Sequence, residues 1–117
     1  MEKTSITNTA KIDIQVHRDA ENQVIEMDWD ATDSPVKGRK ACKSALIALW
    51  DANAKNTLRI DMWTKDMPIG EMNYFMFQSM ITLADTYQNA TNNKEVAEDM
   101  RQFARHFAQK SGIAKKK

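Results

Sequence analysis

NTLRIDMWTKDMP, residues 56–68, is the stretch that decides the fold we expect. Aliphatic side chains alternate in it with polar or aromatic ones, which is the period of a strand with one buried face. Asp66 and Pro68 then provide a cap and a preset φ for the start of a long helix. The stretch therefore predicts a strand-to-helix corner in the middle of the fold. The strand residues divide into Leu58, Ile60 and Met62, facing the core, and Arg59, Asp61 and Trp63, facing away.

Length and composition indicate one globular domain over residues 1–117, with flexible ends at 1–10 and 113–117. The chain is 42% hydrophobic and 28% charged, with a formal net charge of +1. This balance offers no electrostatic case for nucleic acid or an anionic membrane. Cys42 is the only cysteine, which fits a reducing compartment. With no signal-peptide pattern and no apolar run that could span a bilayer, we expect a cytoplasmic protein.

The rest of the chain predicts further strands and helices around that corner. Alternating apolar residues predict two antiparallel strands, one near residues 11–17 and one over residues 24–31. Helical spacing of apolar residues predicts a helix over residues 37–50 and a long helix after Pro68. Asn92 is expected to cap a last helix that ends near Gly112. The expected fold is α+β in the order β-β-α-β-α-α, a mainly antiparallel three-stranded sheet packed on one face by helices.

The long helix has a wider apolar surface than one sheet contact needs. Beside its main stripe lies a second one, formed by Tyr74, Phe77 and Ile81. The last helix needs a partner for its own apolar face, which favours packing of the two helices within one chain. The alternative is that this second stripe forms the interface of a homodimer.

The acidic residues of the second strand invite a catalytic or metal-binding interpretation. Asp28 and Asp30 share one strand face, and Asp61 joins them if the strand at residues 57–65 pairs nearby. Such carboxylates could divide acid and base work. The spacing of Asp28, Asp30 and Asp33 does not continue as a calcium loop, so we expect no metal and no cofactor. An exposed face on which Arg59 offsets the carboxylates explains the same residues more simply.

Trp63 is the residue that most favours a binding function. It is in phase with Arg59 and Asp61, so the strand period places a large apolar ring on a polar face. Tryptophan beside arginine is typical of protein interfaces. The alternative is that a flanking segment covers the ring. We expect a partner-binding surface made by Arg59, Asp61 and Trp63, with Asp33 and Asp66 at adjacent corners.

Two other groups of residues favour structural roles. The basic turn at residues 37–40 crowds the expected helix start, where an anion could bind, but a solvated turn is the simpler interpretation. His17 and His106 have no metal-binding partner pattern and are expected to be surface histidines.

Several segments resemble the GldC family of gliding-motility-associated proteins of the Bacteroidetes. They are WDATD at 29–33, ALWDAN at 48–53, TLRIDMWTKDMPIGEM at 57–72 and TLADTYQNAT at 82–91. The resemblance implies a small cytoplasmic accessory protein that supports surface gliding linked to type IX secretion. It implies no reaction, in agreement with the residues themselves.

The expected function is therefore non-enzymatic binding to a protein of the gliding or secretion machinery. The alternative is a small-ligand or metal-binding protein, or an enzyme, that uses the face carrying Asp28, Asp30 and Asp61.

Overall fold

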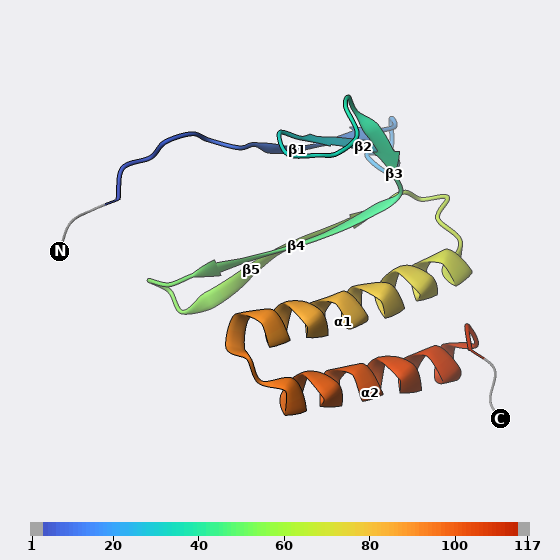
Figure 1. The fold of residues 1–117 in the computed structure, drawn as a ribbon. Helices are drawn as coiled ribbons and strands as arrows, with labels where there is room; N and C mark the ends of the chain where they lie inside the picture. Colours follow the sequence, from blue (N-terminus) through green and yellow to red (C-terminus); the bar gives the residue numbers. More distant parts are fainter. Residues whose placement is uncertain (1–3, 115–117) are drawn as a thin grey trace. The chain divides into compact units, whose positions relative to one another are not determined.

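The computed structural model describes residues 4–114, and the chain divides into two compact units (Figure 1). Met1–Met67 contains all of the strands, and Pro68–Lys117 contains the two helices. The expected flexible ends lie partly outside the described residues, at 1–3 and 115–117. The expectations of a single domain and of helices covering one sheet face stay predictions.

The first unit begins with a three-stranded antiparallel sheet in the order β1-β2-β3. Its strands are β1 (Ile12–Arg18), β2 (Val24–Ala31) and β3 (Lys40–Cys42), so the two strands predicted first are confirmed. Met27 of β2 lies between Val16 of β1 and Cys42 of β3 and is only 1% exposed. This methionine is the buried centre of the sheet.

A two-stranded antiparallel hairpin completes the first unit. It consists of β4 (Ser44–Asp51) and β5 (Asn56–Trp63), and β5 confirms the strand predicted from the opening stretch. Asp51 Oδ1 accepts hydrogen bonds from the backbone N–H groups of Asn53 and Ala54, at 3.0 and 3.2 Å. These bonds hold the connecting turn in the way that aspartate stabilises turns in general.

The helix predicted over residues 37–50 is wrong, because this segment forms β3 and β4. A short apolar run such as ALIALW, residues 45–50, fits both periods, and its pairing partner decides between them. In β4, Ala45, Ile47 and Leu49 share one face opposite aliphatic residues of β5. The α+β class holds, but the arrangement is two antiparallel sheets of three and two strands, followed by two helices.

Only Lys43 separates β3 from β4, so one nearly continuous strand passes from the first sheet into the second. The Lys43 carbonyl accepts a hydrogen bond from Thr64 N at 2.8 Å, which extends the β4–β5 pairing by one step. Lys65 N then donates to the Val24 carbonyl at 2.8 Å. Both sheets are therefore joined through the ends of β2 and β5.

The second unit is a pair of helices, α1 (Ile69–Thr91) and α2 (Lys94–Ser111). Arg101 of α2 reaches Asp85 and Gln88 of α1, both at 2.8 Å. The buried side chains of these helices are small, which allows backbones to approach closely. They are Ala84 of α1 and Ala97, Ala104 and Ala108 of α2.

The helix ends differ in part from expectation. Asn92 does not cap α2: it ends α1 in the left-handed conformation, with φ of 59°, and Asn93 caps α2 by accepting from Val96 N. Pro68 occupies the N-cap of α1, where no side-chain cap bond forms, so Asp66 is not the cap. Gly112 ends α2 with φ of 89°, as predicted.

Neither α1 nor α2 has the length and apolar content needed to cross a bilayer, within the described residues.

We expect Met27→Ala to destabilise the β unit by about 2–5 kcal/mol, because it leaves a cavity in the buried sheet centre. Urea unfolding followed by circular dichroism measures this change. Ile12→Ala is the matched control, since Ile12 is 81% exposed and its truncation should cost no more than about 0.5 kcal/mol. Equal effects of the two substitutions would contradict the assignment of Met27 as the sheet centre.

Candidate functional site

The hairpin register gives β4 and β5 two different faces. One face is apolar up to the turn, because three alternate residues of β4 each lie opposite an apolar residue of β5. Leu58 and Ile60 are nevertheless about half exposed, although the sequence predicts them to face the core. The alternation itself is confirmed. The paired residues of this aliphatic face are Ala45 with Met62, Ile47 with Ile60, and Leu49 with Leu58.

The opposite face, called the tryptophan face below, carries an indole near each end. Trp63 lies at the end of β5 and is 55% exposed, while Trp50 of β4 is 66% exposed. An exposed indole presents a large apolar area that other proteins can bury. The tryptophan face consists of Ser44, Leu46, Ala48 and Trp50 of β4 and Thr57, Arg59, Asp61 and Trp63 of β5.

Arg59 and Asp61 form a two-point ion pair on the tryptophan face. Arg59 donates from Nε to Asp61 Oδ2 at 3.1 Å and from a terminal nitrogen to Oδ1 at 3.0 Å. This hydrogen bonding raises the pKa of the Arg59 guanidinium. Both side chains remain partly exposed, so the pair adds little stability but presents a fixed donor and acceptor beside the indoles.

Trp50 is the surface residue that sequence reasoning missed. The predicted helix placed it on an apolar stripe facing the core. In the strand it lies opposite Thr57 and shares a face with Trp63. Pairing the two strands about the four-residue turn at residues 52–55 places Trp50 opposite Thr57 and could have found it.

The remaining predicted site residues lie in connections. Asp33 is exposed between β2 and β3, and Asp66 is exposed after β5. Asp66 lines a hollow of about 160 Å³ together with Thr64, whose hydroxyl is buried without a hydrogen-bond partner among the described residues. Strand pairing places neither aspartate on the tryptophan face. Their role in partner binding stays a prediction.

The residues of the predicted homodimer stripe differ in exposure. Tyr74 is exposed, whereas Phe77 and Ile81 are half-buried. Their role as an interface also stays a prediction.

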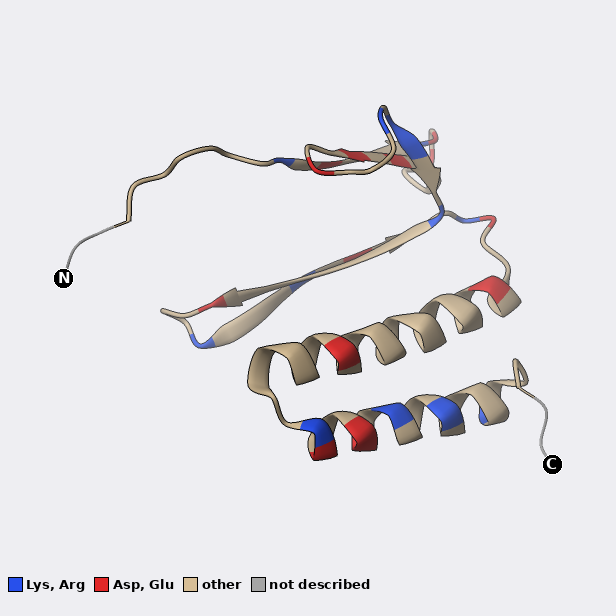
Figure 2. Cartoon of the chain, in the orientation of Figure 1, with Lys and Arg blue, Asp and Glu red and all other residues tan. Residues whose placement is uncertain are grey.

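A second group of polar residues lies on the β1–β2–β3 sheet, where acidic and basic segments lie close together (Figure 2). Asp28 is its centre: His17 Nε2 lies 2.9 Å from Asp28 Oδ2, and Arg39 Nε donates to Oδ1. Arg39 also reaches Asp13 at 3.2 Å. Hydrogen bonds to His17 and then to Arg39 hold the pKa of Asp28 below its usual range. The acidic and basic side chains of this group therefore bond largely to one another.

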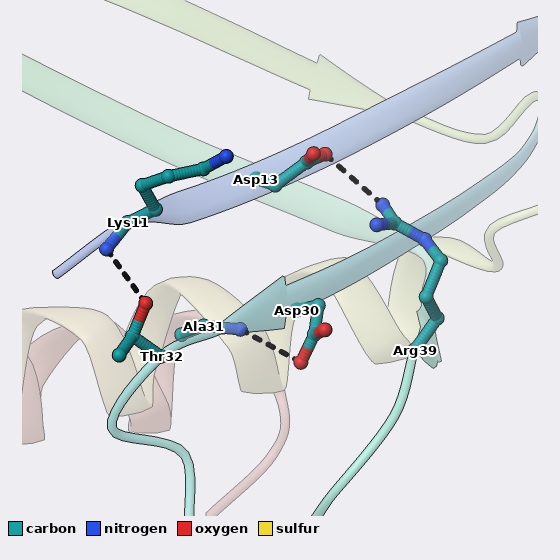
Figure 3. A pocket seen from close by; sticks show the side chains of 6 residues that line it. All are labelled: Lys11, Asp13, Asp30, Ala31, Thr32 and Arg39. Carbon is teal, nitrogen blue, oxygen red and sulfur yellow. Dashed lines mark hydrogen bonds and ion pairs between the residues drawn. The ribbon is translucent and has the colours of Figure 1, made fainter.

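Beside this group is a small open pocket of about 200 Å³ (Figure 3). Its backbone edge is fixed by a 2.9 Å hydrogen bond from Lys11 N to the Thr32 hydroxyl. The pocket is smaller than ordinary ligand sites, and its charges of both signs could hold only a small polar molecule. It is lined by Lys11, Asp13, Asp30, Ala31, Thr32 and Arg39.

The carboxylates considered for chemistry are only partly brought together. Asp28 and Asp30 lie two residues apart on β2 and therefore share one face, but β2 pairs with β1 and β3 rather than β5. Asp61 belongs to the hairpin, where its partner is Arg59. Residues 4–114 contain no cluster of three or more His, Cys, Asp or Glu side chains placed to hold a metal ion.

The basic turn at residues 37–40 is not a helix start, because β3 begins at Lys40. Lys40 Nζ donates to the carbonyls of Val36 and Gly38 and lies 4.3 Å from the centre of the Trp29 ring. The turn is thus held by its own lysine, and the helix N-terminus that was considered as a possible anion position does not exist.

Comparison with known families gives one result. A family model described as gliding motility-associated protein GldC-like matches residues 24–113, from β2 to the end of α2. No curated protein and no solved structure matches the chain.

We expect Asp28→Asn to lower stability at neutral pH, and the difference from wild type to disappear in acid. An aspartate whose pKa is lowered in the folded state stabilises the fold at pH values above its ordinary pKa of 3.8. This stabilisation is lost as the pH falls through the folded-state pKa. Urea unfolding at about pH 6 and about pH 2.5 measures the difference. Asp33→Asn controls for the loss of one negative charge, and a pH-independent deficit would contradict the ion-pair origin.

Proposed function

The chain belongs to the GldC-like family of gliding motility-associated proteins, and from this premise we propose that it acts by binding another protein, without catalysing a reaction. The observation that carries the proposal is the tryptophan face. Two exposed indoles flank an arginine whose guanidinium is already oriented by a carboxylate. Tryptophan and arginine supply a large share of the binding energy in protein interfaces.

The geometry of this face suits a protein partner. Paired strands hold the backbone beneath these side chains in a fixed conformation, so little backbone freedom is lost on binding. The Arg59–Asp61 pair presents both signs of charge and therefore favours a polar partner surface with a matching pair. Trp50 and Trp63 would supply apolar contact on either side of it.

We place the partner in the gliding apparatus, linked to type IX secretion, and the encounter in the cytoplasm. The family description supports the motility role. The single cysteine, which cannot form a disulfide within the chain, supports a reducing compartment.

A small-ligand or enzymatic role remains the alternative, and the pocket at Arg39 is the feature that favours it. The small volume of this pocket weighs against it, because ordinary ligand sites are larger and enclose most of the ligand surface.

We expect Trp63→Ala and Trp50→Ala to weaken partner capture by at least about 30-fold each, the loss typical of an interface hot spot. Stability should change by no more than about 0.5 kcal/mol, because both rings are exposed. The measurements are gliding of cells that carry each variant, quantitative capture of the partner by the tagged chain, and urea unfolding.

Val36→Ala is the matched control, since it removes exposed apolar surface elsewhere in the unit. Normal gliding and capture by both tryptophan variants would contradict the proposal. A large loss of stability would instead show that the rings are structural.

A further inference from the structure

Within residues 4–114, the outer edge of β5 has no strand paired to it. β5 is the end strand of its two-stranded sheet, and β4 occupies one side of it. The bond from Thr64 N to the Lys43 carbonyl fixes which residues face β4, because inward and outward backbone groups alternate along an antiparallel strand. Even-numbered residues of β5 therefore pair with β4. The outward-directed N–H and C=O groups belong to Thr57, Arg59, Asp61 and Trp63.

The sequence of this edge, TLRIDMW at residues 57–63, is self-complementary about Ile60. If a second β5 lies antiparallel with Ile60 opposite Ile60, Arg59 lies opposite Asp61 of the second copy. The two-fold axis creates the same contact a second time, as in any isologous interface. Arg59 and Asp61 are already joined within each chain, so the four charges form a closed and balanced group.

Other registers lack this balance. Centring the pair on Arg59 places two guanidinium groups opposite each other, and centring it on Asp61 does the same with two carboxylates. Like charges directly opposite each other destabilise strand pairing. Centres nearer either end of β5 shorten the paired segment. Charge complementarity therefore selects Ile60.

The same register joins the apolar side chains across the new sheet. At the two-fold axis, Ile60 of one copy lies beside Ile60 of the other, and each is flanked on its far side by Ile47 of its own chain. On the next row, Leu49 and Leu58 continue into Met62 and Ala45 of the second copy. The half-exposed Leu58 and Ile60 thus gain apolar neighbours on the side where the hairpin ends.

We propose that β5 pairs antiparallel with β5 of a second copy of this chain, centred on Ile60, to form a four-stranded sheet in the order β4-β5-β5-β4. The edge lies in the plane of the sheet, whereas the tryptophan face points out of it. Pairing therefore doubles the tryptophan face without covering it. The inference goes beyond the proposed function and does not depend on the identity of the motility partner.

The test is sedimentation velocity of the full chain over a range of concentrations. The wild-type protein should show a monomer–dimer equilibrium. Arg59→Asp and Asp61→Arg should each raise the dimer dissociation constant at least about tenfold, because both cross-strand ion pairs become like-charge pairs. Lys37→Asp, a charge reversal in the exposed β2–β3 connection, should leave the constant unchanged.

Two restorations make the test specific for the register. The double exchange Arg59→Asp with Asp61→Arg recreates opposite charges across the axis and should dimerise like the wild type. Mixing the two single variants should produce a heterodimer, since each then faces the complementary charge. Circular dichroism checks that every variant retains its strands.

A wild-type protein that stays monomeric, or single variants that dimerise normally, would overturn the proposal, as would failure of both restorations. Trp63→Ala separates this inference from the proposed function, because it leaves Arg59, Asp61 and the edge amides in place. It should lose partner capture while the dimer persists. A Trp63→Ala variant that captures the partner normally but no longer dimerises would refute the binding role of Trp63. In that case the charge restorations decide the edge pairing: it stands if they succeed and is overturned if they fail.

Discussion

The cross-strand register of β4 and β5 is the constraint on which the functional surfaces depend. Because residues directly opposite each other share a face, this one alignment collects the aliphatic side chains on one side and both exposed indoles on the other. A shift by one residue would exchange the two sets. The bond between Thr64 and Lys43 fixes the alignment at the open end of the hairpin, and Asp51 orders the turn at the other end.

The parts of the fold that were predictable are those with one clear period. The alternation in β1, β2 and β5 and the long helical stripe of α1 each point to a single structure, and the structure confirms them. Residues 37–50 were not predictable in this way, since their apolar spacing suits a helix as well as a strand. Pairing with β5 decided the matter, and pairing is a property of two segments that no single-segment pattern contains. Trp50 was left out of the expected binding surface because its segment was predicted to be a helix.

The site was predictable to the same extent as its strand. The common face of Arg59, Asp61 and Trp63 follows from the period of β5 alone, but Arg39 could be placed only once β3 was known to pair with β2. Family membership associates the chain with gliding motility, and the exposed tryptophan face is the surface through which we propose that it binds a partner.

The one-residue link between β3 and β4 has a consequence for how this chain can vary in evolution. Lys43 is the only residue between β3 and β4, and its carbonyl accepts a hydrogen bond from Thr64 N. Because side chains alternate between the two faces of a strand, one inserted or deleted residue there would exchange the faces of one sheet relative to the other. The turn at residues 52–55 bears no such restriction. Relatives should accordingly gain or lose residues at the hairpin tip and keep a constant spacing across Lys43.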